Sequence, residues 1–171
     1  PLPPQHLAAD AYSGTADAVH QNAFAVAEED PESVLILAGD HIYKMDYRHM
    51  LRFHQERNAD LTVGAVEVPR GEASHFGIVQ VDEASRIIGF QEKPADPQPV
   101  PGSPDVCLAS MGIYVFTARF LYEELCRDAT RRGSQHDFGS DIIPTVVETN
   151  RVFAYPFVDE ESMYAGIAYY L

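Results

Sequence analysis

Apolar residues recur along the chain at two spacings, one typical of helices and one typical of strands. Helical spacing predicts helices at about 14–29, 46–56, 118–126 and 142–148. Short apolar or β-branched runs predict strands at about 34–38, 61–68, 109–116 and 152–157. Because helix and strand alternate in the first part of the chain, the pattern favours an α/β fold.

The middle of the chain has a different pattern. Residues 77–82 and 86–91 alternate between apolar and polar around Glu83-Ala84-Ser85, which predicts a β-hairpin. Five prolines between 94 and 104 predict a loop. The uninterrupted apolar run 34–38 indicates a fully buried strand, as in a parallel sheet. We therefore expect one α/β domain with a mixed, mostly parallel sheet flanked by helices.

Composition narrows the possible partners. The 171 residues suit one domain, and their net charge of -14 disfavours binding to nucleic acid or to anionic membranes. No apolar run reaches the roughly 18 residues that a membrane span needs. Two cysteines predict no disulfide framework and favour a reducing compartment, the cytoplasm. The start of the chain lacks the features of a signal peptide, so we interpret it as the interior of a longer protein.

Asp40 is the first candidate for chemistry. It directly follows the apolar run 34–38, and ligands of open α/β sheets bind at the carboxyl ends of strands. A carboxylate oxygen is also a suitable ligand for Mg²⁺. The alternative is that Asp40 caps a turn, because Gly-Asp is ordinary turn chemistry.

Lys93 is the second candidate. It follows the second strand of the predicted hairpin, beside Glu92, and its compact ammonium suits a phosphate group. Pro94 should hold Lys93 in extended geometry. The alternative is an exposed lysine at a strand end, paired with Glu92.

Gly14 and Thr15 form the third candidate, at the start of a predicted helix. A glycine lets a ligand approach the backbone, and the first N–H groups of the helix are free for an anion or a base edge. The alternative is an ordinary helix start with Thr15 as N-cap. Of the seven histidines, only His41 and His136 lie beside other candidate groups, and we expect a structural role for each.

Six segments in chain order carry a specific resemblance. They are Tyr12 with Gly14-Thr15-Ala16-Asp17-Ala18-Val19, then Ile36-Leu37-Ala38-Gly39-Asp40-His41-Ile42-Tyr43-Lys44, Phe76-Gly77-Ile78, Glu92-Lys93-Pro94, Ala109-Ser110-Met111-Gly112-Ile113-Tyr114-Val115-Phe116 and His136-Asp137-Phe138-Gly139-Ser140-Asp141-Ile142-Ile143-Pro144. Together they resemble the bacterial glucose-1-phosphate adenylyltransferases. Other sugar nucleotidyltransferases share the Gly-Asp and Glu-Lys-Pro elements but usually not the longer strings.

The resemblance implies a Rossmann-like, GT-A-like nucleotidyltransferase fold and an allosteric enzyme of glycogen biosynthesis. The implied reaction converts ATP and glucose 1-phosphate into ADP-glucose and pyrophosphate. The implied site residues are the catalytic Asp40, which holds Mg²⁺, and Lys93 on the sugar phosphate. Glu92 would bind sugar hydroxyls, Tyr12, Gly77 and Ser110 would complete the sugar-phosphate site, and Gly14 and Thr15 would lie near the adenine.

Three family elements are missing from the chain. A Gly-rich, Arg-containing loop that grips the triphosphate is expected before residue 1, and a β-helix domain with oligomer contacts after residue 171. The Trp-Arg-Asp segment with a second metal ligand is not present as such, because the chain has no Trp. Residues 163–170 resemble that region with residues lost, and Asp159, Glu160 and Glu161 are the acidic residues beside it. We therefore expect residues 1–171 to be an incomplete catalytic domain of a homotetramer. The alternatives are an enzyme using UTP, dTTP or GTP, and a non-catalytic regulatory or sugar-phosphate-binding subunit.

Overall fold

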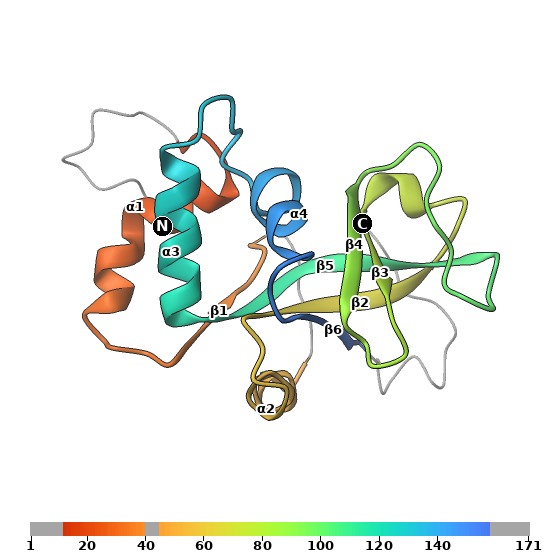
Figure 1. Ribbon diagram of the computed structural model, residues 1–171, viewed down its shortest axis with the longest axis horizontal. Coiled ribbons are helices and arrows are strands. Elements are labelled where there is room, and N and C mark those ends of the chain that lie inside the picture. Colours follow the sequence, from red (N-terminus) through yellow and green to blue (C-terminus); the bar gives the residue numbers. More distant parts are fainter. Residues whose placement is uncertain (1–11, 40–44, 158–171) are drawn as a thin grey trace.

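A mixed β-sheet runs through the molecule, with helices on both of its faces (Figure 1). The structure, a computed structural model, describes residues 12–39 and 45–157. In the described part of the chain, no helix has the length and apolar character that crossing a membrane requires. The expected α/β class is confirmed.

Six strands form the sheet, in the order β4-β3-β5-β2-β6 with β1 also paired to β5. Their bounds are β1 Ser33–Ile36, β2 Leu61–Pro69, β3 Gly77–Val81, β4 Ile87–Glu92, β5 Val106–Thr117 and β6 Val152–Pro156. Only β2 and β6 pair in parallel among these strands, so the expectation of a mostly parallel sheet is wrong. The reason is that β3 and β4 form the predicted hairpin, which forces antiparallel pairing, and that β5 runs against three neighbours.

The predicted helices are present with small shifts of their ends. They are α1 Thr15–Ala27, α2 Tyr47–Glu56, α3 Ala118–Ala129 and α4 Ile143–Val146, with short turns η1 Ala73–His75 and η2 Phe138–Ile142. The helix expected at 142–148 begins earlier, as one π-helical turn. It does so because the Asp137 side chain caps that turn by accepting a hydrogen bond from the Ser140 N–H group, 2.9 Å long.

The buried apolar residues of the described part of the chain form three clusters, and two of these lie on opposite faces of the sheet. Helices α1 and α3 lie side by side and pack with η2 and α4 over one face (Figure 1), around the rings of Tyr114, Phe116 and Phe138. Helix α2 covers the other face, where Met50 packs against Ile113 and Val115. The alternation along β5 thus sends successive side chains into different parts of the core.

Strand β1 differs from its prediction. It is half-buried and antiparallel to β5, not a fully buried strand of a parallel sheet, and Leu37 just beyond it is 46% exposed. The physical reason is that β5 is the only strand paired with β1 in the described residues. Residues 34–39 line a cleft instead of contacting a second strand.

Candidate active site

A cleft of about 740 Å³ lies where β1, β3, β4 and β5 meet helix α1 and the segment 137–139. Five of the predicted site residues line it, namely Thr15, Gly77, Glu92, Lys93 and Ser110. Tyr12 and Gly14 are not among the lining residues. Asp40 lies outside the described residues, as does His41.

The floor of the cleft is a bulge in β5. This strand pairs with β1 over Tyr114–Thr117 and with β3 at Leu108 and Ala109, so residues 110–113 lie between the two partners. Against β2, the register also shifts there, and Gly112 adopts a φ of 69°. A bulge at the point where two neighbouring strands end bends the backbone and leaves Ser110 facing the cleft.

Ser110 shares this floor with Tyr114. Both side chains line the cleft, and burial raises the pKa of Tyr114 to about 12, while its interaction with Ser110 opposes that shift. The Tyr114 hydroxyl is therefore neutral at ordinary pH. The pair provides hydroxyl groups that can bind a polar ligand.

The Glu92 carboxylate lies between two glycines. A Cβ atom added to Gly77 would come within 2.9 Å of Glu92 Oε2, and one added to Gly139 within 2.7 Å of the same oxygen. Burial raises the pKa of Glu92, as does the charge of Asp137, while the Lys93 ammonium opposes them. Carboxylates in such a position accept hydrogen bonds from hydroxyl groups of a ligand.

Lys93 fits both interpretations that the sequence left open, because it lines the cleft and also pairs with Glu92. Its ammonium lies 3.8 Å from Glu92 Oε1, and its side chain is 65% exposed while it lines the cleft. The expectation that Pro94 holds Lys93 extended is wrong, because its φ of 44° is left-handed. The Lys93 N–H group donates to the Phe76 carbonyl over 3.0 Å, which ties this turn to the segment before β3.

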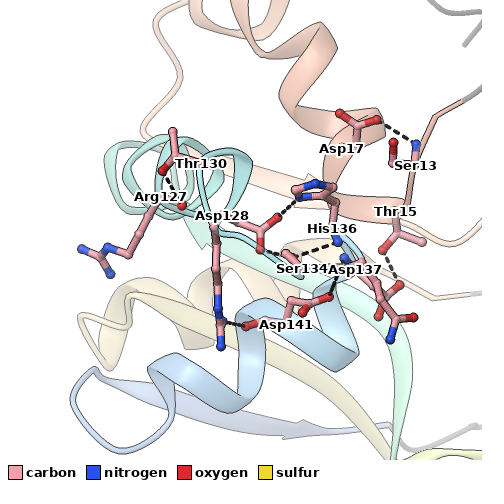
Figure 2. Close-up of polar contacts among 12 residues, drawn as sticks. Ser13, Thr15, Asp17, Arg127, Asp128, Thr130, Ser134, His136, Asp137 and Asp141 are labelled. Carbon is pink, nitrogen blue, oxygen red and sulfur yellow. Dashed lines mark hydrogen bonds and ion pairs between the residues drawn. The ribbon is translucent and has the colours of Figure 1, made fainter. Parts of the chain in front are cut away.

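The start of α1 also differs from its prediction. Gly14, not Thr15, is the N-cap, and the Ala16 and Asp17 N–H groups are not free. They donate to the His136 carbonyl over 2.8 Å and 3.3 Å. The Thr15 hydroxyl instead donates to Asp137 Oδ2 over 2.8 Å (Figure 2). The Ala16 and Asp17 N–H groups are therefore not available to bind an anion.

Tyr12 and Gly14 support this wall from outside the cleft. The Tyr12 hydroxyl accepts a hydrogen bond from the Asn22 amide of α1, 3.0 Å long. A Cβ atom on Gly14 would lie 2.3 Å from the Gln135 carbonyl oxygen, so only glycine permits this close approach of the two backbones.

Sequence reasoning missed Asp137 and Tyr114 as cleft residues. Both lie within segments that carry the family resemblance, Asp137 directly before Phe138-Gly139 and Tyr114 at the end of the β5 bulge. For Asp137, the available signal was a polar residue that can cap a turn close to a glycine, Gly139. No local pattern reveals that Asp137 contacts Thr15, since 122 residues separate them.

The expected Mg²⁺ site depends on Asp40 and thus on residues that the structure does not describe. Among residues 12–39 and 45–157, no group of three or more His, Cys, Asp or Glu side chains could hold a metal ion. Glu92 and Asp137 approach each other across Gly139, but they form only a pair.

Comparison with known proteins gives a consistent family. A family model described as nucleotidyl transferase matches residues 3–162. The chain is 58% identical to a glucose-1-phosphate adenylyltransferase of Rhodopirellula baltica over 93% of its own length and 36% of the relative. It is 54% identical to an enzyme of the same name from Methylococcus capsulatus, over 92% of the chain and 37% of that relative. The chain thus spans about a third of the length of these relatives. Because the family match covers most of its residues, the chain belongs to the nucleotidyl transferase family.

Proposed function

We propose that the chain forms the sugar-phosphate side of a glucose-1-phosphate adenylyltransferase, which makes ADP-glucose and pyrophosphate from ATP and glucose 1-phosphate. The observation that carries this proposal is the meeting of Lys93, Glu92 and Ser110 in one cleft of about 740 Å³. That volume lies in the range of pockets for small ligands. The names of the relatives support the choice of substrates.

Each side chain has a distinct task in this proposal. Lys93 holds the phosphate of the sugar, because its exposed ammonium lines the cleft. Glu92 accepts hydrogen bonds from sugar hydroxyls. Ser110 orients the sugar phosphate from the floor, and Gly77 leaves room for the Glu92 carboxylate.

The chemical step needs positioning more than covalent help. A phosphate oxygen of glucose 1-phosphate attacks the α-phosphorus of ATP, the new P–O bond forms, and the bond to the pyrophosphate group breaks. Lys93 orients the attacking phosphate and offsets its negative charge. Asp40 is the proposed ligand of Mg²⁺, which when bound reduces the repulsion between the two phosphates.

Two alternatives stay open. The first is a related enzyme that uses UTP, dTTP or GTP in place of ATP, a choice set by the side of the cleft formed by Thr15 and its neighbours. A sugar-phosphate-binding subunit without catalysis would use the same Lys93 and Glu92. Both alternatives keep the sugar-phosphate site; the first changes the nucleotide, and the second removes the reaction.

Pyrophosphate release tests the proposal. The assay uses glucose 1-phosphate and Mg²⁺ with ATP, UTP, dTTP or GTP in separate reactions. It compares the 171-residue chain with a chimera that places this chain between the flanking sequences of the Rhodopirellula baltica relative. We expect turnover with ATP in the chimera. Turnover with another nucleotide alone would overturn the choice of ATP, and binding of glucose 1-phosphate without turnover would favour the non-catalytic alternative.

A further inference from the structure

A chain of hydrogen bonds leads from helix α3 to the wall of the cleft (Figure 2). It begins at Asp128 near the end of α3, whose side chain is 7% exposed. The Asp128 carboxylate binds the His136 ring, with 2.8 Å between Oδ2 and Nδ1, and accepts a 2.6 Å hydrogen bond from the Ser134 hydroxyl. The Ser134 oxygen in turn accepts a 3.0 Å hydrogen bond from the His136 N–H group.

These contacts hold His136 in an unfavourable backbone conformation. Its φ of 56° is left-handed, which costs a non-glycine residue roughly 1–2 kcal/mol. Both the ring and the N–H group of His136 are tied to Asp128, directly or through Ser134. A left-handed φ at a non-glycine residue persists only where the surrounding structure enforces it. The contacts of His136 with Asp128 and Ser134 therefore explain why the chain turns at this residue.

The turn has a direct consequence at the cleft. It aims the His136 carbonyl at the Ala16 and Asp17 N–H groups and brings Asp137 to the Thr15 hydroxyl. The Thr15 oxygen also accepts a 3.1 Å hydrogen bond from the Phe138 N–H group. Thr15, Asp137 and Phe138 all line the cleft. The wall formed by α1 is therefore joined to the wall formed by 137–139.

We propose that His136 is a positioning residue that sets the width of the cleft by fixing the start of α1 to segment 137–139. Without its ring, Asp128 loses a buried partner. The left-handed turn then keeps only the His136 N–H bond to Ser134 and the bonds of the Gln135 and Asp137 N–H groups to Asp141, so Thr15 and Asp137 separate more easily. This inference rests on the proposed function only for the identity of the substrates. The positioning itself has its own measurable consequence.

Amide hydrogen exchange at Ala16 and Asp17 measures that consequence. The first N–H groups of a helix have no partner within the helix, so their protection reports the contact with the His136 carbonyl. We expect His136→Leu to speed their exchange roughly tenfold or more, as loss of a hydrogen bond to a charged group predicts. His136→Asn should retain most of the protection, because an Asn amide can replace Nδ1 and tolerates a left-handed φ.

Arg127→Ala is the matched control. Arg127 pairs with the buried Glu124 on the same helix, with 2.5 Å between the charged atoms, so its loss destabilises α3 without touching the loop. This variant should lower the melting temperature and leave exchange at Ala16 and Asp17 unchanged at temperatures where the protein stays folded. Equal exchange in wild type and His136→Leu would overturn the proposal.

Steady-state kinetics of the chimera are the second test of the proposal. We expect His136→Leu to raise KM for both substrates roughly tenfold, and His136→Asn to stay within about threefold of wild type. Faster exchange with unchanged KM values would reduce His136 to a structural residue and overturn its positioning role. A wild-type chimera that turns over no nucleotide would overturn the proposed function instead, while the exchange arm would still decide whether His136 fixes α1.

Discussion

Lys93 and Glu92 are neighbours at the end of β4 but meet different surroundings. Lys93 is mostly exposed, and its ion pair with Glu92 is long at 3.8 Å. Exposed pairs of this kind contribute at most about 1 kcal/mol, so a ligand phosphate can replace Glu92 as the partner of Lys93 at little cost. Glu92 is held between glycines and its pKa is raised by burial, which suits a group that contacts neutral hydroxyls.

Replacement of the two charged candidates should separate binding from chemistry. We expect Lys93→Ala to raise KM for glucose 1-phosphate roughly ten- to hundredfold with a smaller change in kcat, because a charged contact to the phosphate is lost. Asp40→Ala should mainly lower kcat. Arg70→Ala removes the same charge from a surface pair with Asp96 and should leave both constants unchanged. Steady-state kinetics of the chimera with the opposite pattern would contradict the assigned roles.

Five of the candidate residues named from the sequence line the cleft, but the backbone conformation of one of them, Lys93, was predicted wrongly. Lys93 became a candidate because a lysine beside a glutamate follows a strand and precedes a proline, which is a local signal, whereas Glu92 became one only through the family resemblance. The left-handed φ of Lys93 was not predicted, since it depends on the hydrogen bond to Phe76 across the hairpin. Asp137 was missed for the same reason, because its partner Thr15 is remote in sequence.

At the scale of elements, the predictions succeeded where one face of the element is buried. Helix α2 and strand β2 begin and end within one residue of their predicted limits. The apolar spacing of α2 reflects its single buried face, and the apolar run of β2 reflects its burial on both faces. Strand direction was not predictable from the apolar run at β1. A short apolar strand has the same pattern whether its neighbour is parallel or antiparallel, or whether a cleft lies on one side.

Helix α2 is attached to the sheet through a buried histidine, and this predicts a pH effect. His54 is 2% exposed, and its ring nitrogens lie 2.9 Å from Thr62 Oγ1 and 3.2 Å from Thr117 Oγ1. Burial lowers the pKa of His54 from 6.5 to about 4. Between these pH values the unfolded chain binds a proton that the folded chain does not, so stability falls as the pH falls through this window.

The expected size of the effect is at most about 2 kcal/mol between pH 7.5 and pH 5. Urea unfolding at the two pH values measures it. In His54→Gln, the loss of stability between these pH values should be smaller by that amount. His49→Gln, on the exposed face of the same helix, should behave like wild type in this comparison. An unchanged pH dependence in His54→Gln would contradict the assignment of this effect to His54.

The whole molecule carries a net charge of -14, while its candidate ligands are anions. Attraction of phosphates must therefore come from local groups such as Lys93, not from the overall field. The same excess of acid has a cost in stability, because like charges repel in the compact state. The segment after α1 illustrates this, since Glu28, Glu29, Asp30 and Glu32 are all exposed.

Screening of this repulsion should stabilise the fold. We expect the melting temperature to rise by roughly 2–4 °C when NaCl increases from about 0.02 M to about 0.5 M, because the Debye length shrinks below the spacing of surface charges. Glu28→Gln combined with Glu29→Gln should raise the melting temperature at low salt and reduce the response to NaCl. Arg132→Gln makes the net charge more negative and should do the reverse. If both variants respond to salt as wild type does, the repulsion is not what limits stability, and the acidic surface then affects only which ligands approach the cleft.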